Sequence, residues 1–102
     1  MNRLKIIQDG HKMLEETREF LLGKVITTDL GDFTIKHCRF GKNSLLFIAF
    51  EAPCLDEDEA LGVEVEYDSG ITLRNIGGLT GNIETVVATL TQLKVGLQLL
   101  LT

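Results

Sequence analysis

The chain has 102 residues and a net charge of −5, with 44% hydrophobic and 25% charged residues. This length fits one domain, and the balance of apolar and charged residues is typical of a folded globular protein. The negative charge disfavours general nucleic-acid binding, because contact with a phosphate backbone needs a basic surface.

Neither end of the chain predicts a signal sequence or a membrane span. Charged residues interrupt the apolar ones in the first twelve positions, MNRLKIIQDGHK. The run from Ile83 to Leu101 contains Glu84 and Lys94, which makes it too polar for a bilayer. A secreted domain of this size usually carries more cysteines than Cys38 and Cys54. We therefore expect a soluble, cytoplasmic protein with reduced thiols that does not enter a membrane.

The first predicted element is an amphipathic helix over residues 3–22. At about 100° per residue, one continuous apolar arc contains Ile6, Ile7, Gly10, Met13, Leu14, Thr17, Phe20 and Leu21. Gly23 provides a stop for this helix.

Five strands are predicted next, over residues 24–28, 33–40, 45–50, 63–68 and 71–76. The turn sequence DLGD joins the first two as a hairpin. The unbroken apolar run LLFIAF predicts a central strand covered on both faces, whereas VEVEYD alternates and predicts a strand with one open face. Because every connection is short, we expect an antiparallel meander.

A second helix is predicted over residues 83–101, with Asn82 or Thr80 as its N-cap. Its main apolar seam consists of Ile83, Val86, Leu90, Leu93, Leu97 and Leu100. Ala88, Val95 and Leu99 form a second, narrower stripe. Either loops of the same domain cover that stripe or it is a subunit interface, and we favour a homo-oligomer interface. The whole chain, residues 1–102, is thus predicted to be a single α+β domain whose C-terminal helix packs on the sheet.

The glycine-rich stretch NIGGLTGNIE lies between the last strand and the second helix. Glycines before a helix suit a phosphate-binding loop, but the spacing of Gly77, Gly78 and Gly81 matches neither a P-loop nor a dinucleotide turn. Our preferred explanation for these glycines is a strand-to-helix corner that needs positive φ angles, and an anion site is the second explanation. The candidate ligand-binding residues are Arg74, Gly77, Gly78, Thr80, Gly81, Asn82, Lys36 and Arg39.

The segment KHCRFGK is the only basic cluster in the chain, and it could form half of an anion site or be a solvated strand and turn. Strand alternation predicts that Lys36 and Cys38 point one way, with His37 and Arg39 pointing the other. His37 and Cys38 therefore cannot act together as nucleophile and base. With His11 as the only other histidine, no zinc spacing exists, so we predict no catalytic set, no metal and no cofactor.

Eight acidic residues fall between Glu51 and Asp68. The block is either a solvated acidic face or a surface for a basic protein partner, with Asp56, Glu57, Asp58 and Glu59 as the candidate contacts. Glu64 and Glu66 are also candidates to pair with Arg74 across a hairpin.

These patterns favour a small non-catalytic binding protein that homo-oligomerises and blocks or holds a partner protein. Such a protein would resemble in kind the small inhibitors that phages and mobile elements encode. The alternative is a protein that binds or sequesters a nucleotide or other phosphate-bearing molecule at Gly77–Asn82. An enzyme is the third and least favoured hypothesis, because no spacing links a base to a nucleophile.

Overall fold

The computed structural model describes residues 12–41, 45–56, 60–66 and 71–101. Its elements are α2 (Lys12–Leu21), β1 (Val25–Thr28), β2 (Gly31–Phe40), β3 (Leu45–Glu51), β4 (Leu61–Glu66), β5 (Thr72–Gly77) and α3 (Ile83–Leu101). The strands form one sheet in the order β1-β2-β3-β4-β5, and every neighbouring pair is antiparallel. The predicted α+β fold with a five-stranded meander is therefore confirmed. Residues 3–11 of the predicted first helix, and His11 with them, lie outside the described part.

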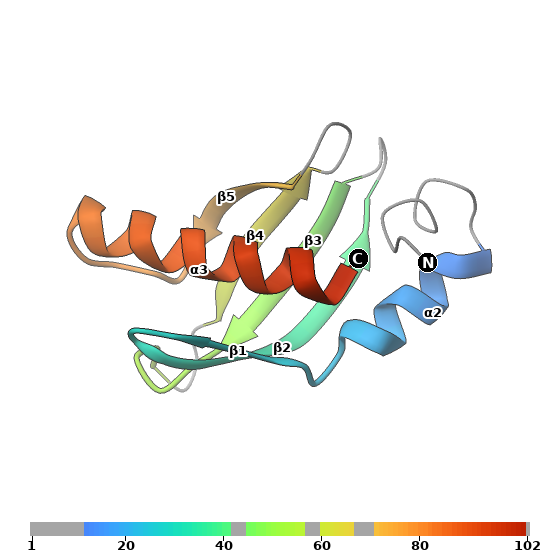
Figure 1. The fold of residues 1–102 in the computed structure, drawn as a ribbon, viewed down its shortest axis with the longest axis horizontal. Helices are drawn as coiled ribbons and strands as arrows, with labels where there is room; N and C mark the ends of the chain where they lie inside the picture. The colour runs from blue at the N-terminus through green and yellow to red at the C-terminus, as the bar shows by residue number, and fades with distance from the viewer. Residues whose placement is uncertain (1–11, 42–44, 57–59, 67–70, 102) are drawn as a thin grey trace.

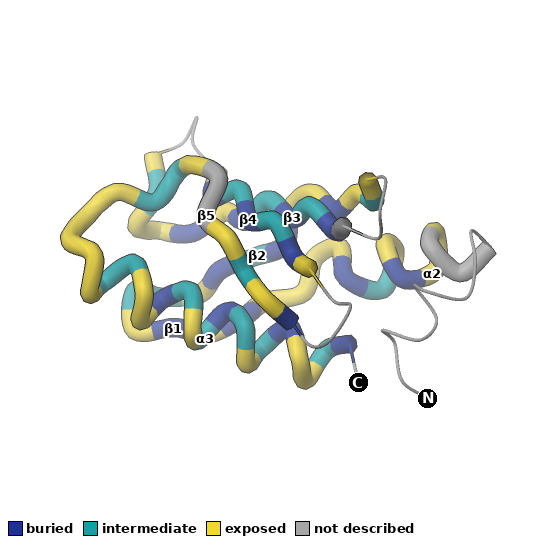
Figure 2. The backbone as a smooth tube through the Cα atoms, turned by 90° about the horizontal axis from the view of Figure 1, so that it is seen from above, coloured by how far each residue is buried: buried dark blue, intermediate teal, exposed yellow. Residues whose placement is uncertain are grey.

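The sheet is curled, and α3 lies across one of its faces (Figure 1). Figure 2 shows buried and exposed positions alternating along the strands, as expected when one face of a sheet is covered and the other is open. The residues that share the covered face include the cross-strand pairs Ile35–Phe50 and Cys38–Ile48, all of which are buried. The rings of Phe33 and Phe50 meet edge to face on this side, with centroids 6.2 Å apart.

Both helices contribute to the core on the covered face. Leu93, Leu97 and Leu101 of α3 are fully buried, and Leu21 at the end of α2 joins the same apolar cluster. Leu93 and Leu97 were predicted to lie in the seam of α3, and that prediction is confirmed. Ile83 was wrongly assigned to it, because the first turns of α3 extend past the strands and leave Ile83 81% exposed (Figure 1).

A close approach between α3 and the edge strand β1 depends on a glycine. A Cβ atom on Gly96 would lie 2.6 Å from Cγ2 of Ile26, which is closer than any normal contact. At the turn that follows β1, the backbone N–H of Asp29 donates to Oε1 of Gln92 at 2.9 Å. The helix is therefore fixed on β1 at two points about one turn apart.

The face of the sheet away from α3 is only partly covered. Leu46, Ile48 and Phe50 of β3 are buried, but Phe47 and Ala49 between them are half-buried on the other face. β3 is indeed the central strand. The expectation that both of its faces are covered is wrong for the described residues, because Phe47 and Ala49 stay half-buried.

A β-bulge in β2 changes which side chains reach the open face. The register shifts between Ile35 and His37, so Lys36 is the extra residue. Lys36 and His37 are consequently both exposed, whereas Cys38 is buried. The predicted grouping of Lys36 with Cys38 is therefore wrong, because a bulge inserts one residue and breaks the two-residue alternation.

Candidate functional site

The glycine loop is a tight corner between β5 and α3. Gly78 has a φ of 89°, and a Cβ atom there would overlap the carbonyl oxygen of Ala60. Any other residue at this position would strain the backbone and collide with the chain before β4. These two constraints account for Gly78 without a ligand.

Asn82 has a structural role at the start of α3. Its Oδ1 accepts a hydrogen bond from the backbone N–H of Thr85 at 2.7 Å, which is the geometry of a helix N-cap. Of the two residues predicted as the N-cap, Asn82 and Thr80, Asn82 is the one observed. An anion at this helix terminus would have to displace a bond that the chain already makes.

The hollow beside the glycine loop carries negative charge. It measures about 370 Å³ and is lined by Leu30, Cys54, Leu55, Asp56, Gly78, Leu79, Thr80 and Thr85. Among the described residues that line it, Asp56 is the one charged group, and a carboxylate there opposes the binding of a phosphate. Arg74 instead pairs with Oε1 of Glu64 at 2.8 Å, as predicted for this hairpin.

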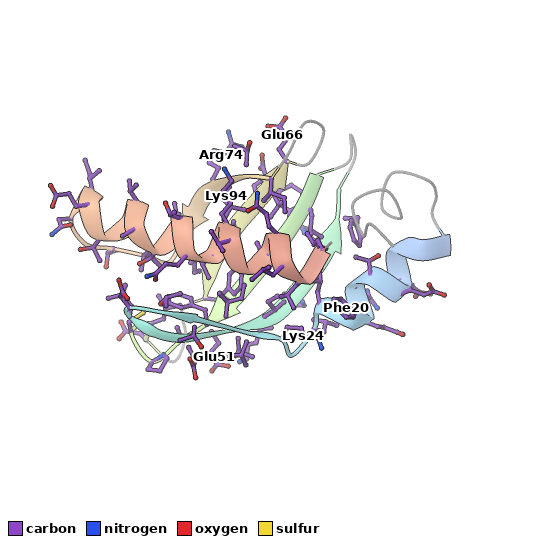
Figure 3. All side chains as sticks on the ribbon, viewed as in Figure 1. Phe20, Lys24, Glu51, Glu66, Arg74 and Lys94 are labelled. Atoms are coloured by element: carbon purple, nitrogen blue, oxygen red, sulfur yellow. The ribbon has the colours of Figure 1, made fainter. Side chains whose placement is uncertain are left out.

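The predicted ligand-binding residues do not form one site. Lys36 and Arg39 lie on β2, whereas Arg74 lies on β5, three strands away, which is about 14 Å at the usual strand spacing. Lys36 forms an ion pair of 3.2 Å with Glu51. Figure 3 shows Glu51 and Arg74 at opposite edges of the molecule in that view.

A row of side chains crosses the open face of the sheet. Arg39, Phe47, Glu64 and Arg74 are direct cross-strand neighbours on β2, β3, β4 and β5. The guanidinium of Arg39 lies over the ring of Phe47, with its carbon 5.1 Å from the ring centroid. In the part of the chain that the structure describes, one end of this row is therefore cationic with no carboxylate in ion-pair distance, and the other end is an ion pair.

A hollow of about 500 Å³ adjoins this row where α2 comes close to β2. It is lined by Arg18, His37, Cys38, Arg39, Phe47, Ile48, Ala49 and Gly62. Arg18 comes from α2, and nothing in the sequence links it to His37 and Arg39, because only the packing of α2 against β2 brings them together. A single arginine in a helix gives no sequence signal of such a role.

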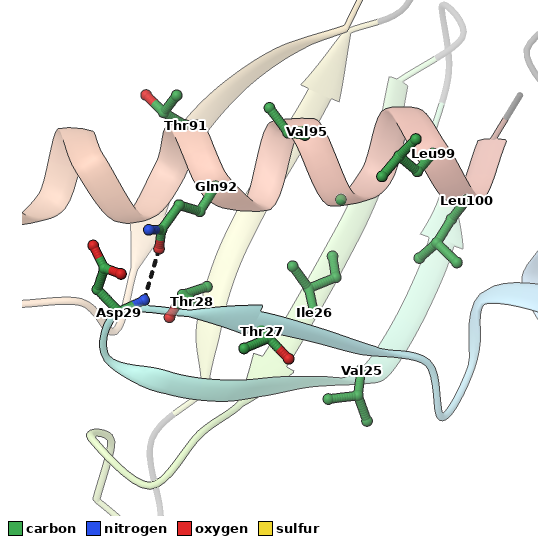
Figure 4. Close-up of a pocket in the computed structure, with 11 residues that line it drawn as sticks. Val25, Ile26, Thr27, Thr28, Asp29, Thr91, Gln92, Val95, Leu99 and Leu100 are labelled. Atoms are coloured by element: carbon green, nitrogen blue, oxygen red, sulfur yellow. Dashed lines mark hydrogen bonds between the residues drawn. The ribbon is translucent and has the colours of Figure 1, made fainter.

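An apolar surface groove of about 610 Å³ runs along the line where α3 meets β1 (Figure 4). Leu99 and Val95 on the helix side are 74% and 51% exposed, and Val25 on β1 is 52% exposed. Ala88, further along α3, is exposed as well. The second stripe predicted from the sequence is thus uncovered by the described residues.

The acidic block is described only in part. Asp56 is exposed, while Glu57, Asp58 and Glu59 lie outside the described residues. Glu66 is exposed and Glu64 is half-buried by its pairing with Arg74. The proposed contacts with a basic partner therefore remain a prediction.

The two cysteines have different surroundings, and both are free thiols. Burial raises the pKa of Cys38 from 9.0 to about 12, although the positive charge of Arg18 acts in the opposite direction. Cys54 is exposed. Within the described residues, no group of three or more His, Cys, Asp or Glu side chains is arranged to hold a metal ion.

Comparison with protein-family models, with curated proteins and with solved structures finds no match for this chain. No helix in the described part is long and apolar enough to span a membrane.

Proposed function

We propose that the chain is a non-catalytic binding protein that forms a homodimer through α3 and β1 and holds or blocks a partner protein. The observation that carries this proposal is the exposed apolar face formed by Ala88, Val95 and Leu99 beside the groove along β1. Leucine and valine side chains exposed to this degree, next to an apolar groove, are typical of protein interaction surfaces.

The charge distribution favours a second copy of the chain as the occupant of this surface. The net charge is −5, so two copies repel each other wherever charged surfaces meet. Among the described residues that line the groove, Asp29 is the one that carries charge. Two copies can therefore approach through this face with little charge repulsion and with a gain from buried apolar area.

The shape of the surface suits a two-fold interface. α3 has 19 residues, which corresponds to a length of about 28 Å. A two-fold axis near Val95 would set the apolar face of α3 against its own copy, so that each copy covers the same residues of the other.

The acidic segment is the surface we assign to the partner protein. Asp56, with Glu57, Asp58 and Glu59, would engage a basic surface and thereby block it, as a small inhibitor does. A dimer presents this segment twice, which raises the avidity for a partner that offers two contacts.

The oligomeric state tests the proposal. Native mass spectrometry and light scattering should report a dimer for the unaltered chain and a monomer for the double variant Val95→Glu and Leu99→Glu, because charges buried in an apolar interface lack partners. The control carries Ala60→Glu and Thr80→Glu, which add the same charge at exposed positions outside the groove.

A dimer that persists in the groove variant would assign the interface elsewhere. A monomer for the unaltered chain at all accessible concentrations would remove the self-association. Circular dichroism of each variant verifies that the fold is retained.

The alternative function, binding of a phosphate-bearing molecule at Gly77–Asn82, receives less support. Asp56 lines that hollow, the side chain of Asn82 caps α3, and Arg74 pairs with Glu64.

A further inference from the structure

We propose that the hollow lined by Arg18, His37 and Arg39 binds a small molecule that carries a phosphoryl group on a compact body. This site differs from the glycine loop and lies on the face of the sheet away from the α3 groove. It is independent of the proposed dimer.

Uncompensated positive charge is the first argument. Among the described residues, no carboxylate lies within ion-pair distance of Arg18 or Arg39, whereas Lys36 and Arg74 each have one. Arg18 and Arg39 both line this hollow, so an anion bound there would be attracted by two positive charges. Two arginines beside one hollow are not expected from the overall composition, because the protein has a net charge of −5.

The positioning of Arg39 is the second argument. Its guanidinium lies over the ring of Phe47, its direct neighbour on β3. Gly41 packs against the same ring, because a Cβ atom there would lie 2.6 Å from Cε2 of Phe47. Gly41 and Arg39 therefore both lie against this ring, and a guanidinium over a ring face can still offer its N–H donors for a bidentate contact with a phosphoryl group.

The residues at the floor of the hollow determine which chemical group can be attached to the bound phosphoryl group. Ala49 and Gly62 are cross-strand neighbours, and their small side chains leave the space that the hollow occupies. Its volume of about 500 Å³ falls within the range of about 300–1,000 Å³ typical of small-molecule sites. A small apolar floor beside two arginines and a histidine suits a phosphate monoester better than a bare ion.

The surrounding charges exclude a long polyanion. Glu64 is the direct neighbour of Phe47 on β4, and Glu66 follows it two residues later. A nucleic-acid strand that continued across the sheet would meet these carboxylates, so a compact ligand is favoured.

Titration calorimetry with adenosine monophosphate, ribose 5-phosphate and inorganic phosphate tests the site. We expect saturable binding of at least one phosphate ester, weakened about tenfold or more by Arg18→Gln or by Arg39→Gln, since each removes a charge-assisted hydrogen bond. The matched control is Arg74→Gln, an exposed arginine of the same face that should leave the affinity within about twofold.

A second variant tests the floor. Ala49→Leu fills the hollow from the open face and should abolish ester binding while inorganic phosphate still binds at the arginines. The absence of saturable binding for all three probes would overturn the proposal. So would an equal loss in Arg74→Gln, or binding of ester and inorganic phosphate with equal affinity and no effect of Ala49→Leu. Urea unfolding of each variant shows that its fold is intact.

Discussion

The thiol of Cys38 couples the stability of the fold to pH. Its pKa is raised from 9.0 to about 12 in the folded protein, because the buried sulfur sits in the apolar core where a thiolate is poorly solvated. The folded state therefore retains this proton at pH values where the unfolded state has lost it.

We expect the stabilisation from Cys38 to be complete below pH 9 and to decline as the pH rises towards 12. Urea unfolding at a series of alkaline pH values measures this decline, and the substitution Cys38→Val, which removes the ionisable group, should reduce it. A thiol reagent should modify Cys54 alone in the folded protein and both cysteines in denaturant. Fast modification of Cys38 in the native state would contradict its burial.

Single residues show where the sequence was insufficient. The burial of Thr17 and Leu21 follows from helical periodicity, and both are fully buried. The bulge at Lys36 has no such signal, because the two-residue alternation of β2 reads the same with or without an inserted residue. Arg18 entered no predicted site, since its neighbours on β2 are set by how α2 packs and not by any local pattern.

At the level of elements, α3 was predicted with the bounds observed, Ile83–Leu101, because its apolar period and its N-cap are both local properties. The packing of α3 on the sheet, in contrast, does not follow from local sequence properties. Glycine is a poor helix former, and the reason for a glycine at position 96 is seen only in the fold, where Ile26 of β1 approaches it. Likewise, the basic residues predicted to bind one ligand lie far apart in space, because the strand order separates β2 from β5.

The approach of α3 to β1 at Gly96 gives a prediction about packing. Alanine at this position gains about 1 kcal/mol of helix propensity but must displace Ile26 at a cost of about 1–3 kcal/mol, so Gly96→Ala should lower the free energy of unfolding by about 1 kcal/mol. Urea denaturation measures the change. The control Val87→Ala, at an exposed position of the same helix, should be near neutral.

A double-mutant cycle separates the steric cause from others. In an Ile26→Ala background the cost of Gly96→Ala should shrink, because the atom that the new Cβ meets has been removed. An equal cost in both backgrounds would mean that another contact is responsible.

For the whole molecule, the two proposed surfaces lie on opposite faces of one curled sheet and differ in charge. Of the lining residues that the structure describes, the α3 groove has one charged side chain, whereas the hollow at Arg18 and Arg39 is a local positive site in a negative protein. Eight of the ten basic residues occur in the first 50 residues, and nine of the fifteen acidic ones occur after them. This asymmetry is readable from the sequence, but the face on which each charge lies required the fold.

Ionic strength should therefore act on the two surfaces in opposite directions. Between about 0.01 M and about 0.15 M salt the Debye length falls from about 30 Å to about 8 Å, which screens the repulsion between two copies that each carry a net charge of −5. We expect the dimer measured by sedimentation equilibrium to tighten over this range, while phosphate-ester binding at Arg18 and Arg39 weakens. The double variant Val95→Glu and Leu99→Glu should remain monomeric throughout. A dimer that dissociates as salt is added would be held by ion pairs, and the apolar face of α3 would then not be its interface, because apolar contacts are not screened by salt.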